Sequence, residues 1–288
     1  MKGSRNIWIV LLLLAAADIV LWRQIGLGNG TRPGYYFFSV GQGDSELVVA
    51  PGGAKILIDG GPNASVVSAL EKTMPPGDRY LDLVVSSHPQ LDHFAGIVNV
   101  IENYRIGAFL WNGRSDSPNV AEWRDLVAHI AEKRIAMIPV GRGDIMRAGD
   151  SVLHVISPDV FIAQSAELND TGLVMRVEMP GAAALFAADI GSNIESYLVR
   201  RDAAALRTDV LKVAHHGSKY ASSADFLRAV SPRAVVIEVG AHNTYGHPSG
   251  EALQRIASST DAAVFRTDQD GTVAIVADGG IYKAITGL

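Results

Sequence analysis

Histidines and aspartates gather in a few loops of this 288-residue chain. Six of the eight histidines lie in three loops, and each loop follows an apolar run that reads as a buried strand. Neutral imidazole and carboxylate are ordinary ligands of zinc, manganese and iron, and strand ends are common ligand sites in α/β sheets. Metal chemistry is therefore the first hypothesis. The histidines come in the pairs His88 and His93, His215 and His216, and His242 and His247.

The first of these loops runs from Ser86 to His93 and follows the apolar, β-branched run 81–85. A tight turn at this point can direct both His88 and the Asp92–His93 pair into one cavity. The alternative interpretation is a polar turn in which Asp92 only caps the following helix.

Asp189 and the second histidine pair also stand at strand ends. A lone carboxylate after the apolar run 184–188 is expensive to bury unless it is paired or binds a metal, although it can also cap the next helix. Adjacent residues of an extended chain point in opposite directions, so we expect only one of His215 and His216 to be a direct ligand. The other would contact substrate or orient a carboxylate. Together with Asp92, the three loops predict a shared dinuclear metal site.

The elements that position these loops follow from hydrophobic periodicity and from glycine and proline punctuation. Strands come in runs at the start of each half of the chain and alternate with helices later, which indicates two packed sheets with helices outside. We expect strands at 35–40, 45–50, 55–58, 81–85, 108–111, 135–140, 151–157, 173–178, 183–187, 210–214, 234–239, 263–267 and 272–277. We expect helices at 64–72, 94–104, 120–133, 194–201, 223–229 and 250–258.

Composition restricts the ligands and the partners. The chain has no cysteine, so disulfides and thiolate metal sites are excluded. Hydrophobic residues make up 48% and charged residues 19%, and the formal net charge of −5 argues against broad electrostatic binding of nucleic acid. A nucleic acid bound locally at a metal-rich cleft stays compatible with this charge.

The first residues have the marks of an export signal. Lys2 and Arg5 precede an apolar run over 7–17, and a second apolar stretch from Ile19 ends at Trp22 and Arg23. We favour an uncleaved signal anchor over 1–25, a linker over 26–34 and one folded domain over 35–288. The basic residues predict a single-pass membrane protein with the domain outside the cytoplasm. The alternative is a secreted protein, cleaved after the alanines at 15–17.

The ordered motifs resemble the metallo-β-lactamase superfamily, in particular the extracytoplasmic domain of ComEC-type DNA-uptake channels and its stand-alone relatives. The His88–His93 turn is similar to the His-x-His-x-Asp-His signature of that superfamily. The resemblance implies an αββα four-layer sandwich with the site along one edge. The other matching pieces, in family order, are Val40–Ser45, Leu57–Gly61, Asp189, Leu211–Ser218, Tyr245–Ser249 and Arg266–Gly271.

The same resemblance implies two ligand sets for one or two divalent ions, zinc or manganese. The first metal would bind His88 and position 90, and the second would bind Asp92, His93, Asp189 and the loop of His215 and His216, with Asp189 bridging. The sequence departs from the family at Gln90, where an amide oxygen replaces a stronger ligand, and at Ser39, where relatives often have aspartate.

The implied chemistry is hydrolysis of a phosphodiester, because a metal pair activates water and binds the oxygens of the reacting group. We expect Asp92 to take part in catalysis, and His247, Asn243 and Lys219 to stabilise negative charge or protonate a leaving group. DNA or another phosphoester outside the cytoplasm is the expected substrate. Two alternatives stay open: a metallo-hydrolase of a cell-wall phosphoester, lactam or ester, and a binding domain with a degraded metal site.

Overall fold

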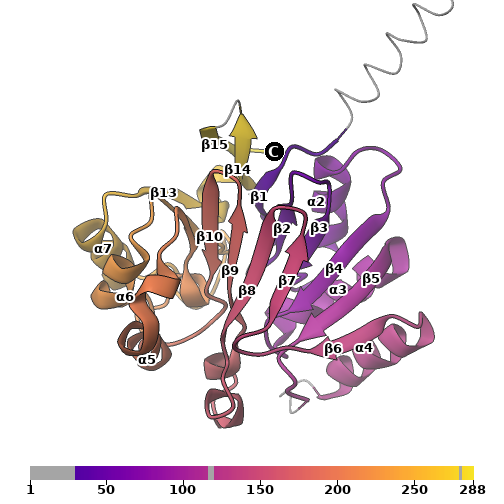
Figure 1. The fold of residues 1–288 in the computed structure, drawn as a ribbon, viewed down its shortest axis with the longest axis horizontal. Helices are drawn as coiled ribbons and strands as arrows, with labels where there is room; N and C mark the ends of the chain where they lie inside the picture. The colour runs from indigo at the N-terminus through magenta and orange to yellow at the C-terminus, as the bar shows by residue number, and fades with distance from the viewer. Residues whose placement is uncertain (1–29, 116–119, 279–280) are drawn as a thin grey trace, which may run out of the picture.

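Runs of buried β-branched and aromatic residues form two sheets that pack face to face, with helices on both outer faces (Figure 1). The computed structural model describes residues 30–115, 120–278 and 281–288. Within these residues the first sheet has the strand order β15-β14-β1-β2-β3-β4-β5-β6. Its strands are β1 (Gly34–Phe37), β2 (Glu46–Val49), β3 (Lys55–Ile58), β4 (Tyr80–Ser86), β5 (Arg105–Trp111), β6 (Ala136–Pro139), β14 (Val273–Asp278) and β15 (Ile281–Thr286).

The second sheet has the strand order β13-β12-β11-β10-β9-β8-β7. Strands β10 to β13 run parallel, as do β3 to β6 in the first sheet, so each sheet gathers several carboxyl ends at one edge. The strands are β7 (Ile145–Ala148), β8 (Ser151–Ser157), β9 (Val174–Met179), β10 (Ala182–Phe186), β11 (Val210–Lys212), β12 (Ala234–Ile237) and β13 (Ala263–Arg266).

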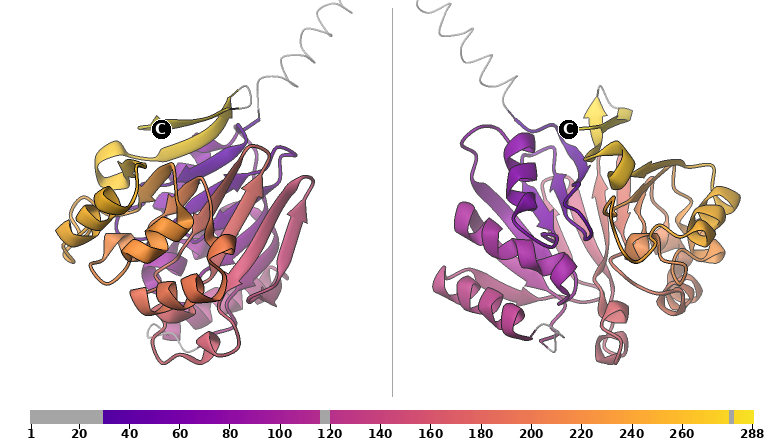
Figure 2. Two further views of the ribbon diagram at one scale, coloured as in Figure 1. Left: turned by 60° about the vertical axis from the view of Figure 1, so that its left-hand side comes forward. Right: turned by 180° about the vertical axis from the view of Figure 1, so that it is seen from behind.

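Three apolar layers hold the sandwich together, as burial of apolar surface requires when two sheets are covered by helices. Between the sheets, Phe37 stacks on Phe186 with ring centroids 6.0 Å apart. Beneath the helices of the first sheet, Phe94 meets Trp123 edge to face. Figure 2 shows the two helical layers on opposite sides. They comprise α2 (Ser65–Thr73), α3 (Leu91–Asn103) and α4 (Val120–Glu132) on the first sheet, and α5 (Ser192–Asp202), α6 (Ala224–Val230) and α7 (Gly250–Ser259) on the second.

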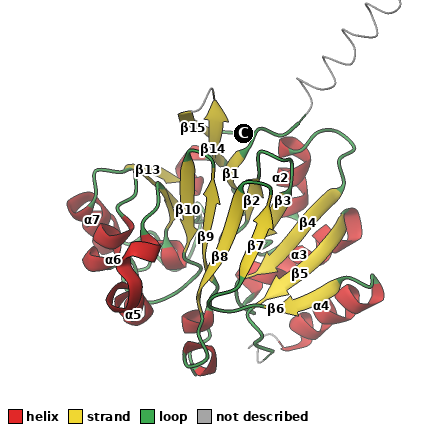
Figure 3. Ribbon diagram, viewed as in Figure 1, coloured by secondary structure: helices red, strands yellow, loops and turns green. Residues whose placement is uncertain are grey.

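The predicted αββα arrangement is confirmed, and two kinds of difference have physical reasons (Figure 3). Strands β7 and β15 were not predicted; both are edge strands with much exposed surface, so their apolar periodicity is weak. Helix α3 begins at Leu91 rather than Phe94, which places Asp92 and His93 on its first turn.

The predicted anchor over 1–25 and residues 26–29 of the predicted linker lie outside the described residues. Among the residues from 30 onward that the structure describes, no helix has the length and apolar character needed to cross a bilayer.

Candidate metal centre

The site forms where strands of the two sheets end side by side. Asp59 follows β3 and His88 follows β4 in the first sheet. In the second sheet Asp189 follows β10, and the left-handed turn that holds His216 follows β11. Because these strands run parallel within each sheet, their carboxyl ends meet at one edge of the sandwich.

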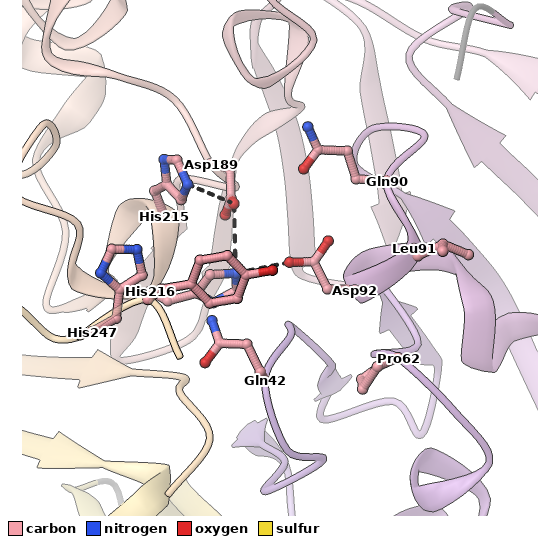
Figure 4. A pocket seen from close by; sticks show the side chains of 10 residues that line it. Gln42, Pro62, Gln90, Leu91, Asp92, Asp189, His215, His216 and His247 are labelled. Carbon is pink, nitrogen blue, oxygen red and sulfur yellow. Dashed lines mark ion pairs between the residues drawn. The ribbon is translucent and has the colours of Figure 1, made fainter. Parts of the chain in front are cut away.

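Four side chains converge at this edge: Asp92, His93, Asp189 and His216. One ligand atom from each lies within 4.8 Å of all the others. Asp189 Oδ2 is 3.5 Å from Nε2 of His93 and 3.5 Å from Nε2 of His216. Asp92 Oδ2 is 3.4 Å from Nε2 of His216. Figure 4 shows Asp189 and His216 facing Asp92 across the centre of the site.

Buried hydrogen bonds fix both imidazoles with Nε2 toward the centre. Nδ1 of His93 lies 2.8 Å from Oδ2 of Asp59, and Nδ1 of His216 lies 3.0 Å from the carbonyl oxygen of Glu238. An imidazole that donates through Nδ1 keeps the lone pair of Nε2 for a metal. Neither Nε2 atom has a hydrogen-bond partner among the described residues, although both are buried. Two orphaned imidazole nitrogens beside two carboxylates fit a divalent metal ion.

The charges of the cluster reinforce one another. Burial acts to lower the pKa of His93, but the carboxylates of Asp189 and Asp92 raise it well above its ordinary value. Burial acts to raise the pKa of Asp92, yet His93 and His216 lower it to about 2. The pKa of Asp189 is likewise held well below its usual range, against burial, by His216 and His93. The cluster therefore keeps both carboxylates ionised, which is the state that binds a cation.

Backbone strain is concentrated around the cluster. Asp59, Ala188, His215 and His216 all have positive φ, between 46° and 53°, although none of them is glycine. Residues other than glycine rarely adopt positive φ. Where they do, the surrounding structure holds them in this conformation, often at a functional site. A single ligand was predicted because an extended chain points adjacent side chains in opposite directions. In the structure both His215 and His216 are left-handed rather than extended, so that reason does not apply to this pair.

Two glycines let the loops approach closely enough to build the site. A Cβ on Gly96 would lie 2.0 Å from the carbonyl oxygen of Gly60, and this contact seats α3 against the turn that follows β3. A Cβ on Gly43 would lie 2.2 Å from the carbonyl oxygen of Asp92. The backbone of α3 is therefore clamped between two turns, so that His93 meets Asp59.

The structure places the other predicted metal ligands around this set. His88 is fully buried and packs against the His93 ring at 4.2 Å, but it is not one of the four converging side chains. Gln90 lines the cavity and donates its amide to Asn169 Oδ1. His215 lies on the cavity wall with Nε2 3.8 Å from Asp189 Oδ2. Gln90 and Asp92 come from one side of the cavity and His215 and His216 from the other (Figure 4).

The residues predicted to act on charge fall in three different places. His247 lines the cavity, with its ring centroid 5.8 Å from that of His215. Asn243 instead holds its own loop: its amide donates to the carbonyl oxygens of Gly240 and His247, and its Oδ1 accepts from the amide of His247. Lys219 is exposed, its ammonium lies over the ring of Tyr220, and it is not among the residues that line the cavity.

Several residues that support the centre were not assigned a role from the sequence. Asp59 accepts from the backbone amide and hydroxyl of Ser87 as well as facing His93. Asp44 contacts the ammonium of Lys212 and lies 3.1 Å from Nδ1 of His216. Asp44 and Asp59 stand in glycine-rich turns at strand ends, and that position was the available signal.

A buried pair of carboxyl groups lies behind the centre. Glu46 on β2 and Glu238 after β12 are both almost fully buried. Burial, followed by the nearby Glu238, raises the pKa of Glu46 well above its ordinary value. Burial also raises the pKa of Glu238, to about 7. Nothing in the spacing of these two glutamates in the sequence indicated that they would meet.

The centre opens into a cavity of about 590 Å³. Its walls come from both halves of the sandwich, and they combine carboxylates, imidazoles, two amides and a single phenol. The lining residues are Gln42, Pro62, Gln90, Leu91, Asp92, Asp189, His215, His216, Tyr245 and His247. A small polar substrate group can therefore reach Asp92, Asp189 and His216 from solvent, with His93 buried behind them.

Comparison with known proteins agrees with this geometry. Residues 39–242 match the family model described as the metallo-beta-lactamase superfamily, so the chain belongs to that superfamily. The fold and the His/Asp cluster are consistent with a metallo-hydrolase.

Two curated relatives match most of this chain. The chain is 29% identical to ComE operon protein 3 of Bacillus subtilis (strain 168) over 253 residues, which cover 81% of this chain and 32% of that protein. It is 30% identical to competence protein ComA of Neisseria gonorrhoeae over 282 residues, which cover 96% of this chain and 36% of that protein. The chain thus spans about a third of the length of these relatives.

A solved structure shows the same fold. The metallo-beta-lactamase fold protein YhfI from Bacillus subtilis superposes with a TM-score of 0.55 at 12% identity. The match covers 89% of this chain and all of that one. At this identity it shows that the two chains share a fold.

Proposed function

We propose that the chain is a metal-dependent phosphodiesterase that acts on DNA or on another phosphoester. The observation that carries the proposal is the set of four converging side chains, with two orphaned Nε2 atoms, at the floor of an open cavity. Asp92, His93, Asp189 and His216 would hold the ion. Two imidazoles and two carboxylates suit zinc or manganese. When bound, such an ion supplies Lewis acidity and lowers the pKa of water at the site.

Two neutral imidazoles stand beside the place where a phosphodiester would lie. Burial lowers the pKa of both His215 and His247, so each ring is neutral at neutral pH. His215, next to Asp189, is placed to accept the proton that the attacking water loses as its oxygen bonds to phosphorus. His247 is placed to donate an N–H to a non-bridging oxygen as negative charge develops there. The leaving oxygen takes its proton from solvent through the open side of the cavity.

The relatives support the choice of substrate class. One relative is competence protein ComA and the other is ComE operon protein 3, which motivates DNA as the first substrate to test on this chain. The cavity itself supports hydrolysis more generally, because His215 and His216 lie beside the Asp189 carboxylate on its wall.

Hydrolysis of bis(p-nitrophenyl) phosphate and of linear DNA tests the proposal. Protein stripped with chelator and then reconstituted with manganese or zinc should cleave both, and the Asp189→Ala variant should cleave neither. Opening of a lactam or ester by reconstituted protein that leaves phosphodiesters intact would overturn the choice of bond. Failure to retain any metal would favour a binding domain instead.

We further propose that residues 1–25 anchor the protein in the membrane and that the domain acts outside the cytoplasm. The support is the apolar run between the basic residues Lys2 and Arg5 and the interfacial residues Trp22 and Arg23. Protease added to intact spheroplasts should digest the domain. Protection of a full-length protein that fractionates away from membranes would contradict both the anchor and a secreted form.

A further inference from the structure

One aromatic side chain on the cavity wall has no role in the chemistry described above. Tyr245 lines the cavity, and 70% of its surface is exposed. Its ring lies over His247 with centroids 5.9 Å apart and an angle of 18° between the planes. A large apolar ring held at the mouth of a polar cavity, one face on an imidazole, leaves its other face free for a ligand.

The loop that carries Tyr245 is fixed before any ligand arrives. Oδ1 of Asn243 accepts from the backbone amides of both Tyr245, at 3.2 Å, and His247, at 3.0 Å. Gln42 ties the loop to the opposite half of the sandwich, because its Oε1 accepts from the amide of Gly240 at 3.1 Å. A ligand that stacks on Tyr245 therefore meets a preorganised surface and loses less affinity to ordering.

The charge of the cavity limits which interactions can bind a nucleic acid there. The described residues that line the cavity include the carboxylates of Asp92 and Asp189 but no lysine or arginine. The chain as a whole carries a formal charge of −5. Phosphate contacts with basic side chains, which supply most of the affinity of duplex-binding proteins, are therefore absent from these walls. Beyond the bound ion, affinity for a nucleic acid has to come from another interaction.

We propose that Tyr245 is a stacking residue that makes the site specific for phosphodiesters flanked by an unpaired base. The proposal rests on the proposed phosphodiesterase function and narrows its substrate to single strands. Base faces are available for stacking in a single strand and are hidden inside a duplex. The NH2 group of Gln42, which Figure 4 shows turned toward the cavity, is placed to donate to the same nucleotide.

The test compares a base-bearing strand with an abasic strand of the same length and charge. Both carry a fluorophore and phosphorothioate linkages, and binding to manganese-reconstituted protein is followed by anisotropy. The wild type should bind the base-bearing strand more tightly than the abasic strand. In Tyr245→Ala the ratio of these two affinities should fall by roughly 5- to 150-fold, the range for one base–aromatic stack. Tyr245→Phe keeps the ring and should keep the preference. Binding of an unlabelled duplex should compete poorly.

Tyr220 provides a matched control, since its side chain is 68% exposed and it is not among the cavity-lining residues. Tyr220→Ala should bind like the wild type. An unchanged preference in Tyr245→Ala, or a lost one in Tyr245→Phe, would overturn the stacking role. Hydrolysis of the unmodified strand is measured separately. A wild type that binds base-bearing strands preferentially without cleaving them refutes the phosphodiesterase and leaves the stacking role standing.

Discussion

Nδ1 of His93 lies 2.8 Å from Oδ2 of Asp59, and this contact determines which nitrogen the imidazole presents to the centre. Both side chains are buried, and Asp59 is itself held by the amide and the hydroxyl of Ser87. A carboxylate in this position fixes the tautomer, orients the ring and raises the basicity of the free nitrogen. The metal affinity of His93 therefore depends on a residue that does not face the metal.

We expect Asp59→Asn to weaken metal binding by roughly 10- to 100-fold, the usual effect of losing such a partner. The amide keeps the shape of the side chain but removes the charge that holds Nδ1–H. Competition with a chromogenic chelator measures the affinity. Asp209→Asn is a suitable control, because Asp209 also accepts from a buried-strand amide, that of Ala183, away from the centre. Equal affinities for the two variants would contradict the role of Asp59.

Much of this arrangement follows from the sequence, because strand ends are visible there. Apolar runs before Asp189 and before His215 identified two buried strands, and parallel strands bring such ends together. The two-sheet architecture followed in the same way, from runs of strands and their alternation with helices. The edge strands β7 and β15 escaped because half-exposed strands carry little apolar signal.

The orientation of side chains could not be predicted. The metal-ligand roles of His88 and Gln90 stay predictions from the motif: the packing places His88 against the His93 ring, and the NH2 group of Gln90 donates to Asn169. Which of His215 and His216 faces the four-residue cluster depends on two left-handed residues in succession, a conformation that local sequence rarely encodes. Asn243 lies in the same loop as His247, and its side chain hydrogen-bonds the backbone of that loop instead of facing the cavity.

Asp189→Ala should be the most damaging change to metal binding. Its Oδ2 atom is 3.5 Å from Nε2 of both His93 and His216, so its loss removes an oxygen that lies between the two rings. We expect less than a tenth of an equivalent of metal after reconstitution, measured by elemental analysis, and no hydrolysis. Asp170→Asn is the control, since Asp170 bonds Asn193 outside the cluster. Full metal content in Asp189→Ala would show that the centre is elsewhere.

Gln90→His should raise the amount of metal bound. Imidazole is a better ligand than an amide for zinc, and residue 90 already lines the cavity. The competing demand is the hydrogen bond to Asn169, which the variant can release. The effect is measured as metal equivalents per chain in Gln90→His and in the companion variant Asn169→Ala, which removes the partner of the Gln90 amide. An unchanged stoichiometry in both would mean that residue 90 serves the neighbouring loop rather than a metal.

His88 should make the metal-free protein sensitive to acid. Burial, followed by the nearby His93, lowers the pKa of His88 to about 4, whereas an unfolded histidine titrates near 6.5. Between these values the unfolded chain binds a proton that the folded protein excludes, so stability falls as pH falls from about 6.5 to about 4. The His88 contribution is about 3 kcal/mol at ~1.36 kcal/mol per pH unit.

Urea unfolding in chelator at pH 7 and pH 4.5 checks this dependence. His88→Gln cannot titrate, so its free energy of unfolding should change less over that interval than that of the wild type. His129→Gln is the control, because His129 lies on α4 and bonds the carbonyl of Asp125. Identical pH dependence for His88→Gln and the wild type would exclude a buried neutral His88.

Gly96→Ala should destabilise the protein even though alanine is the better helix former. Gly96 lies inside α3, where alanine normally gains about 1 kcal/mol over glycine. The added Cβ would lie 2.0 Å from the carbonyl oxygen of Gly60 and 2.5 Å from that of Asn63, both of them backbone atoms that cannot rotate away. Forcing the helix off this turn costs roughly 1–3 kcal/mol or more. It also separates His93 from Asp59, so metal affinity should fall together with stability.

The matched substitution is Gly250→Ala, because Gly250 is also helical and a Cβ there meets nothing within 4 Å in the described structure. It should leave stability unchanged or raise it slightly, with metal binding intact. Urea unfolding and chelator competition on both variants separate helix propensity from the close approach. If Gly96→Ala were as stable as Gly250→Ala and bound metal as tightly, the contact between α3 and the turn at Gly60 would not be what positions His93.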